Sequence, residues 1–250
     1  MAQFGNEEYP DRSSDVFIKV TDETIALFEE GKVLLIDKPI HWTSFDVVRK
    51  IRSTLHVRKV GHAGTLDPLA SGLLIVCTGK FTKQINEYMA QEKEYTGSFT
   101  LGAVTPTYDL ESKPEKHQDV SLISESLIKE ATAQFTGEID QFPPIYSAIK
   151  KKGTPLYELA RRGEEIELES RKIVVKSFEI TAIEMPVVHF KIVCSTGTYI
   201  RSIAHDFGAA LGCGAYLSSL RRTAIGEFKI EDAITMEGFI EMIVAMQEKK

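Results

Sequence analysis

The chain has 250 residues, of which 43% are hydrophobic and 26% are charged, a globular composition that excludes disordered, collagen-like and fibrous proteins. Its three cysteines lie far apart and form no CxxC pair, which excludes a disulfide framework and a zinc ribbon and predicts a reducing, cytoplasmic location. The sequence has no apolar stretch of membrane-spanning length and no apolar secretory signal, so we predict a soluble protein with no membrane partner.

The formal net charge of −6 comes entirely from the first 30 residues, which hold eight acidic and two basic residues. Residues 31–250 are therefore neutral, with 28 residues of each sign. Two basic segments lie on this neutral body: residues 47–62 hold five bases and no acid, and residues 150–162 hold five bases and one acid. Such clusters are typical of a surface that binds a phosphate backbone, and the alternative is a pair of solvated faces.

The first predicted elements follow a polar N-terminal segment. An apolar run over 33–39 predicts a strand, which Pro39 ends. Thr43 and Asp46 then form a capping-box pattern that predicts the start of a helix. The apolar positions of that helix, at helical spacing, are Phe45, Val48, Ile51 and Leu55. Residues 61–72 follow as a predicted loop, because three glycines, a proline and several small residues gather there.

The rest of the chain mixes strands and helices. Strands are predicted from apolar runs or from alternation over 73–79, 95–103, 173–183 and 187–194. Helices are predicted over 123–135 and 200–211, with a last helix from about residue 236. Strands and helices do not alternate strictly, which favours an α+β fold around a mixed sheet over a doubly wound fold.

Several common catalytic motifs are missing. The stretch from Gly72 to Lys80 lacks the spacing of a P-loop, and Phe81 stands where a P-loop has Ser or Thr. The sequence contains no GxGxxG, HExxH or GxSxG, and no histidine pairs with a cysteine at metal-ligand spacing. We therefore predict no metal and no cofactor.

Asp67 is the first candidate catalytic residue. It lies in the small-residue loop, directly after the first basic segment and before an apolar strand. A carboxylate held in such a loop can act as a nucleophile or a general base. The alternative is a turn aspartate that precedes Pro68, and this is the more typical meaning of the position when it is read alone.

Arg201 is the second candidate. It is next to Ile200, an apolar position of the predicted helix 200–211, so we expect its side chain to be half-buried. A half-buried arginine needs a carboxylate partner, and the alternative is a surface arginine that binds phosphate. The same two interpretations apply to the pair Arg221 and Arg222.

Five sequence blocks carry a resemblance to a known family. Residues 61–83, GHAGTLDPLASGLLIVCTGKFTK, resemble the catalytic motif of the bacterial tRNA pseudouridine synthase B (TruB) family, and residues 37–52 resemble the motif before it. Further blocks that match the family in the same order lie at 93–109, 141–163 and 195–228. The five blocks together cover roughly residues 31–230.

The resemblance implies a pseudouridine synthase fold, with a mixed, mainly antiparallel central sheet flanked by helices, over residues 31–230. Outside it we predict an acidic N-terminal extension over 1–30 and a short C-terminal helix over 231–250. Many family members carry an RNA-binding PUA domain at the C-terminus, and we expect no full PUA domain in this chain.

The resemblance also implies roles for single residues. Asp67 matches the essential catalytic carboxylate, and Arg201 matches the arginine that forms an ion pair with it. Tyr95 matches a tyrosine that packs on the target base and takes part in a proton transfer. The residues expected to bind the substrate are His62, Leu220 and Lys83, together with Arg49, Lys50 and Arg52 of the first basic segment.

The implied substrate is uridine 55 in the T-arm stem-loop of tRNA, and the implied product is pseudouridine. The attack of Asp67 at C1′, an attack at C6 and a route through C2′ deprotonation all stay open. We expect a monomer that needs no protein partner. Two alternatives are a non-catalytic protein that binds or folds tRNA through the same groove and a hydrolase that uses Asp67 on a nucleoside.

Overall fold

A nine-stranded sheet forms the centre of the computed structural model, which describes residues 19–147, 149–151, 153–163 and 168–248. In chain order its strands are β1 (Val33–Lys38), β2 (Val60–His62), β3 (Ala70–Thr78), β4 (Lys93–Leu101), β5 (Gly137–Gln141), β8 (Arg171–Glu184), β9 (Val187–Cys194), β10 (Ala215–Ile225) and β11 (Phe228–Lys229). They lie in the order β1-β3-β10-β4-β9-β8-β5, with β2 beside β3 and β11 beside β10. Only β3 and β10 pair in parallel among these strands, so the predicted mixed, mainly antiparallel sheet is confirmed.

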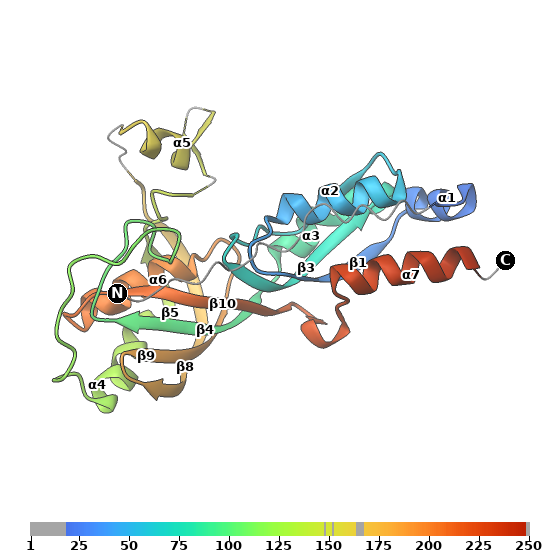
Figure 1. Ribbon diagram of the computed structural model, residues 1–250. Coiled ribbons are helices and arrows are strands. Elements are labelled where there is room, and N and C mark those ends of the chain that lie inside the picture. The colour runs from blue at the N-terminus through green and yellow to red at the C-terminus, as the bar shows by residue number, and fades with distance from the viewer. Residues whose placement is uncertain (1–18, 148, 152, 164–167, 249–250) are drawn as a thin grey trace, which may run out of the picture.

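Helices pack along the sheet, and the whole molecule is elongated (Figure 1). The α-helices are α1 (Asp22–Glu30), α2 (Ser44–Leu55), α3 (Ile85–Ala90), α4 (Glu125–Ala131), α5 (Leu156–Arg161), α6 (Ile200–Ala210) and α7 (Met236–Glu248). The 3-10 helices are η1 (Gly79–Gln84), η2 (Thr132–Phe135) and η3 (Ile230–Asp232). Within the described part of the chain, no helix combines the length and the apolar character of a membrane span.

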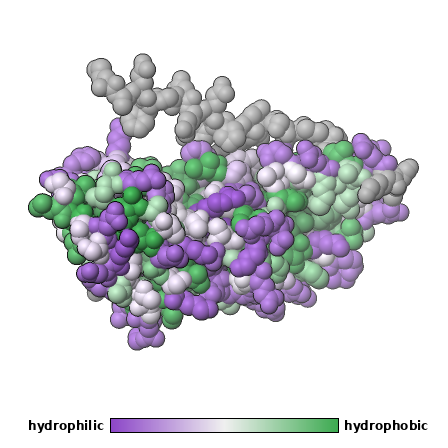
Figure 2. All heavy atoms as spheres, turned by 90° about the horizontal axis from the view of Figure 1, so that it is seen from below, coloured by the Kyte–Doolittle hydropathy of each residue, from purple (hydrophilic) through white to green (hydrophobic). Residues whose placement is uncertain are grey.

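A short arm rises from the body near α6. It consists of α5 and the two-stranded pair β6 (Lys150–Lys151) and β7 (Thr154–Pro155) (Figure 1). Figure 2 views the molecule from below, where hydrophilic and hydrophobic residues are interspersed on the surface. In Figure 1 the arm and α2 lie above the sheet. The surface seen in Figure 2 is the opposite, lower face of the molecule.

Most predicted elements are confirmed, with one exception among the helices. The predicted helix over 123–135 divides into α4 and η2, which begins at Thr132. The sequence patterns did not predict α1, α3, α5 or the strands β2, β5, β6, β7, β10 and β11. Among these, β10 is the most important for the site, because it lies between β3 and β4 in the centre of the sheet. The predicted loop over 61–72 is shorter than expected, because β2 runs through His62 and β3 begins at Ala70.

Helix α1 lies inside the stretch predicted as an acidic extension. Its Phe28 is buried, and the backbone N–H of Thr21 donates to the side chain of Gln247 on α7 at 2.9 Å. The described part of this stretch therefore packs on the body. Residues 1–18 lie outside the described residues, and the division of the chain at residues 30 and 230 stays a prediction.

The predicted capping box and apolar stripe of α2 are confirmed except at one position. Thr43 accepts from the backbone of Asp46, and the Asp46 side chain accepts from the backbone of Thr43. The prediction that Phe45 belongs to the buried stripe is wrong, because its side chain is 60% exposed. The stripe runs instead through Ser44 and Val47, which carry the 3.6-residue period one position away from Phe45.

Phenylalanine rings fill the core between α6 and the sheet. Phe99 on β4 is fully buried, stacks on Phe190 of β9 with ring centroids 4.3 Å apart, and contacts Phe207 of α6 at 5.8 Å. Tyr95, four residues before Phe99 on β4, belongs to the same buried cluster. Because Tyr95 also lines the pocket that contains Asp67, this core borders that pocket. A rigid ring cluster at this place holds the sheet and α6 in one arrangement.

Phe99→Ala is expected to destabilise the protein by about 3–5 kcal/mol, because truncation of a buried aromatic ring leaves a cavity that the core only partly fills. Urea unfolding followed by circular dichroism measures the change. Phe45→Ala is the matched control, since the same atoms are removed from a mostly exposed position. Equal losses of stability in the two variants would contradict the assignment of Phe99 to the core.

Candidate active site

A pocket of about 640 Å³ lies where the loop before β3 meets β4, β10 and the start of α6. Its lining includes Asp67 from the loop, Tyr95 from β4, Leu220 and Arg222 from β10 and Arg201 from α6. Four of these are predicted site residues, and the fold brings them together from distant parts of the sequence. A pocket of this volume can enclose a nucleotide-sized group.

The loop that carries Asp67 is held in place from two sides. Ser44, the first residue of α2, accepts from the backbone N–H of Leu66 at 2.9 Å and donates to the Leu66 carbonyl at 3.3 Å. On the other side, the Asp67 carbonyl accepts from the N–H of Ala70 at 3.0 Å, and Pro68 accepts from His41 at 2.7 Å. The turn interpretation of Asp67 is therefore correct for its backbone, and its side chain remains free to face the pocket.

Arg201 and Asp67 form an ion pair at the edge of the pocket. Nε of Arg201 lies 2.9 Å from Oδ2 of Asp67, and Nη2 donates to Oδ1 at 3.3 Å. The Arg201 side chain is only 6% exposed, whereas that of Asp67 is 36% exposed, so the expectation of a half-buried arginine understates its burial. The guanidinium thus lies behind the carboxylate, and the carboxylate is presented to the pocket.

Further acceptors fix the guanidinium of Arg201. Its Nη1 donates to the carbonyls of Thr107 and Tyr146, each at 3.2 Å. The buried carboxylate of Asp109 lies 3.6 Å from Nε. Burial raises the pKa of Asp109, and Arg201 opposes that rise. Asp109 was not among the predicted site residues, although it is the last residue of the block at 93–109.

Tyr95 forms part of the pocket wall and is almost fully buried. It pairs in register with Arg222 on β10, and Gly97 pairs with Leu220. A Cβ on Gly97 would lie 2.2 Å from the Ser219 carbonyl, so glycine lets the two strands approach closely here. Burial raises the pKa of the Tyr95 hydroxyl, and the Arg222 guanidinium opposes that rise.

Three buried cations lie at or near the pocket: Lys93 and Arg222 line it, and Lys38 interacts electrostatically with Asp67 and Arg222. Lys38 and Lys93 donate to backbone carbonyls, and burial lowers the pKa of each amine to about 8. Arg222 is 1% exposed and also donates to carbonyls. From sequence, Arg222 had two open interpretations, and the two lysines were not predicted as site residues. Lys38 and Lys93 do lie inside the blocks at 37–52 and 93–109.

The remaining predicted substrate-binding residues lie outside this pocket. His62 is half-buried on β2, and burial together with Arg222 lowers its pKa. Lys83 lies in η1, beyond the far end of β3, and lines a separate hollow with Arg58, Lys59 and Lys80. Lys83 therefore lies away from the Asp67 pocket, at the other end of the nine residues of β3, and its expected contact with the substrate stays a prediction.

The three predicted bases of α2 occupy its polar side. Arg49 is 63% exposed and pairs with Asp46 at 2.8 Å. Arg52 is exposed and donates to the carbonyl of Val60 at 3.1 Å. Lys50 is partly exposed between them. Within the described residues, no cluster of three or more histidine, cysteine, aspartate or glutamate side chains has the arrangement of a metal site.

Comparisons with known proteins confirm the family that the sequence blocks suggest. The family model of the N-terminal domain of TruB family pseudouridylate synthases matches residues 52–200, and that of the tRNA pseudouridylate synthase B C-terminal domain matches 201–250. The tRNA pseudouridine synthase B of Flavobacterium johnsoniae is 54% identical over 86% of this chain and 96% of its own length. The protein of the same name from Chloroherpeton thalassium is 50% identical over 88% of this chain and 93% of its own length.

The fold is also similar to that of solved structures. The chain is similar to a Cbf5-Nop10-Gar1 complex, with a TM-score of 0.70 and 31% identity over 94% of this chain and 64% of the other. It is also similar to an H/ACA RNP bound to a substrate RNA containing 2′-deoxyuridine, with a TM-score of 0.67 and 30% identity over 89% of this chain. The chain spans 56% to 64% of the length of these solved chains. On these matches and on the geometry of the pocket, the chain belongs to the TruB family of pseudouridylate synthases.

Proposed function

We propose that the protein is a tRNA pseudouridine synthase that converts uridine 55 in the T-loop of tRNA into pseudouridine. One observation carries the proposal: the carboxylate of Asp67 faces a nucleotide-sized pocket, with the buried guanidinium of Arg201 behind it. The name of the relatives, tRNA pseudouridine synthase B, supports tRNA as the substrate. The position of the target uridine rests on the resemblance of the sequence blocks.

The reaction is an isomerisation, so it needs neither an oxidant nor water. The N1–C1′ bond breaks and its electron pair moves to the base, the base turns, and C5 forms a bond with C1′. The C5 proton leaves, and N1 gains a proton. Asp67 acts in the first stage, at C1′, at C6 or on the C2′ proton, and the adjacent guanidinium of Arg201 holds its carboxylate in place.

The target uridine has to leave its stacked position in the RNA loop to reach Asp67. We propose that the ring of Tyr95 then packs against the base, because aromatic side chains stack on nucleobases regardless of their sequence. Leu220 lines the pocket beside Tyr95. His62 lies on the strand that leads into the Asp67 loop, where it is placed to contact the surrounding RNA loop.

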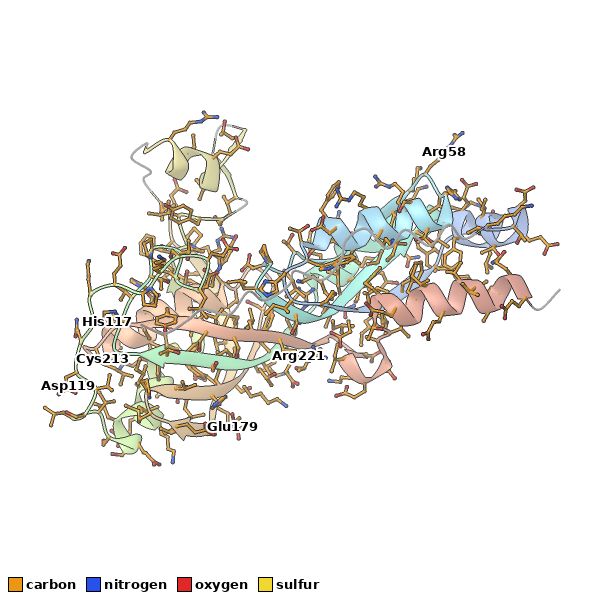
Figure 3. The ribbon with its side chains drawn as sticks, viewed as in Figure 1. Arg58, His117, Asp119, Glu179, Cys213 and Arg221 are labelled. Atoms are coloured by element: carbon orange, nitrogen blue, oxygen red, sulfur yellow. The ribbon has the colours of Figure 1, made fainter. Side chains whose placement is uncertain are left out.

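Basic residues on the side of α2 are proposed to bind the tRNA backbone. Arg49 and Arg52 are exposed on α2, and Arg58 projects from the body after it (Figure 3). The hollow around Lys83 carries further bases on the same part of the molecule. Positive charge along this side would attract the phosphates of the T-arm although the whole chain has a net charge of −6.

We further propose that residues 31–230 act as the catalytic unit, in the cytoplasm and as a monomer without a protein partner. The solved relatives named above belong to assemblies with other proteins or RNA, so this point needs its own measurement. Light scattering on the active protein, alone and with a T-arm transcript, gives the mass of each species. A dimer, or activity only after addition of a cell extract, would contradict the proposal.

Conversion of uridine in a T-arm stem-loop transcript tests the proposed activity. The transcript is incubated with the purified protein, treated with carbodiimide (CMC) and read by primer extension. We expect one stop, one nucleotide on the 3′ side of uridine 55, and no such stop in a transcript with cytidine at position 55. Binding without conversion would favour a tRNA-binding or folding protein. Release of free uracil would favour a hydrolase.

Replacement of Arg49, Lys50 and Arg52 by glutamine is expected to weaken tRNA binding and to flatten its salt dependence. Removal of a single phosphate-binding cation reduces the slope of log affinity against log salt by about 0.7–0.9. The single-turnover rate at saturating tRNA should hold, because these residues position the RNA and do not line the Asp67 pocket. Filter binding at several salt concentrations measures the slope.

A charge-matched variant controls for the removal of three positive charges. Lys129, Lys172 and Lys176 are exposed on α4 and β8, which lie at the other end of the molecule from α2 (Figure 1). Their replacement by glutamine should leave the salt slope at its wild-type value. Equal slopes in both triple variants would show that α2 is only a solvated face.

A further inference from the structure

Arg222 interacts with three separate parts of the site. Its Nε donates to the carbonyl of Leu73 on β3 at 2.8 Å, and its Nη2 donates to the carbonyl of Gly64 at 3.1 Å. Arg222 also lies opposite Tyr95 of β4 in the sheet register, and its charge favours the ionised form of the Tyr95 hydroxyl. Gly64 lies three positions before Asp67 in the same loop, so one side chain joins this loop, β3 and β4.

A glycine on β3 lets the backbone of β10 at Arg222 approach β3 closely. Gly72, at the start of β3, has a φ of +103°, and a Cβ there would lie 2.4 Å from the Arg222 carbonyl. Only glycine adopts this conformation without strain and also leaves the space. The close parallel contact between β3 and β10 at this point places the guanidinium under the Asp67 loop.

The burial of Arg222 is difficult to explain as a stabilising device alone. Its side chain is 1% exposed, and among the described residues its hydrogen-bond partners are backbone carbonyls, with no carboxylate in an ion pair. A buried cation without a countercharge is unfavourable, and a well-packed apolar side chain often stabilises such a place better. Its position on the lining of the pocket indicates a role in the site.

We propose that Arg222 is a positioning residue that holds the Tyr95 hydroxyl and the Asp67 loop in one fixed arrangement. The inference rests on the proposed function and extends it, since Arg201 orients the Asp67 carboxylate directly and Arg222 acts through backbone and tyrosine contacts. Both groups then meet a flipped base at a constant separation, which a reaction that turns the base within the pocket requires.

The charges around this contact define the expected titration. Asp67, Cys194 and Arg222 face Tyr95, and Lys38, Lys93 and His62 surround Arg222. Burial and Asp67 raise the pKa of Tyr95, and Arg222 lowers it. Removal of the Arg222 charge should therefore raise the pKa of Tyr95 further, because a phenolate loses its neighbouring cation.

Two variants separate the charge of Arg222 from its shape. Arg222→Lys keeps the charge and loses the planar fork, and Arg222→Gln loses both. We expect the single-turnover rate at saturating tRNA to fall by about 10²-fold in each, as a small misplacement of catalytic groups causes, with an unchanged Kd. Arg221→Gln is the matched control, since its neighbour Arg221 pairs with Asp37 and does not line the Asp67 pocket.

A spectroscopic measurement distinguishes positioning from a merely structural role. In protein with ¹³Cζ-labelled tyrosine, the Tyr95 resonance, assigned with Tyr95→Phe, should titrate at higher pH in Arg222→Gln than in wild type. An unchanged titration, or a wild-type rate in Arg222→Gln, would overturn the inference. If the Arg222 variants do not fold, ¹⁵N spectra of the arginine guanidinium groups in wild type and Tyr95→Phe decide, and an unmoved Arg222 resonance overturns it.

The two levels of the proposal fail in different ways. A wild-type protein that forms no pseudouridine in the T-arm transcript would overturn the proposed function and the inference that rests on it. Normal wild-type conversion together with a fast Arg222→Gln variant would overturn the inference alone. The spectra report the contact between Arg222 and Tyr95 without reference to activity.

Discussion

Asp67→Asn is expected to abolish pseudouridine formation while tRNA binding stays close to wild type. The amide keeps the size and shape of the side chain but has no charge, so it can neither attack carbon nor take a proton. Loss of a central catalytic group lowers turnover by about 10³-fold or more. The loop itself should persist, because Ser44 and Ala70 hold it through backbone groups that the substitution leaves in place.

The measurement separates chemistry from binding. The single-turnover rate comes from the CMC assay and the Kd from filter binding, with protein purified from a host that lacks its own enzyme for this uridine. Glu111→Gln is the matched control, since Glu111 is a second carboxylate on the lining of the pocket, and its turnover should stay near wild type. Near-native turnover in Asp67→Asn would contradict the assignment of Asp67.

Local sequence patterns predicted much of the fold because they report which face of an element is buried. The alternation at 95–103 predicted β4, and the 3.6-residue period of 200–211 predicted α6. The Asp67 loop shows the limit of such patterns. Its residues are typical of a turn, and a turn is present, so only the five ordered blocks together distinguished this turn from an ordinary one.

Strand β10 could not be predicted in the same way, for a physical reason. Register shifts between Leu217 and Ser219 and between Arg222 and Ala224 interrupt its pairing with β4. Each such bulge reverses the alternation of side chains, so the sequence shows no period of two residues. The strand also buries a charged residue, Arg222, which local hydrophobicity does not predict.

The partners of the site residues were also beyond local patterns. Tyr95 meets Arg222, and Arg201 meets both Asp67 and Asp109, only because strands and helices distant in sequence come together. Charge and burial alone left Arg201 with either a carboxylate or a phosphate as partner. The topology, with β10 between β3 and β4, brings these groups together.

Arg201→Lys is expected to lower the single-turnover rate by orders of magnitude, although the charge is retained. The guanidinium faces both oxygens of Asp67 and donates to the carbonyls of Thr107 and Tyr146, with Asp109 at 3.6 Å. A lysine ammonium is a compact point charge that cannot reproduce this planar arrangement. It would leave buried acceptors unpaired, and the Asp67 carboxylate would lose its fixed orientation.

The single-turnover rate and the Kd, measured separately, distinguish this role from a phosphate contact. An arginine that only touches phosphate would weaken binding modestly on substitution and leave the rate unchanged. Arg221→Lys is the control, because the Arg221 guanidinium also donates two hydrogen bonds to a carboxylate, that of Asp37, at 2.6 and 3.0 Å. Arg221 does not line the Asp67 pocket. If Arg201→Lys keeps the wild-type rate, or if Arg221→Lys loses as much, the ion pair with Asp67 is not what the reaction requires.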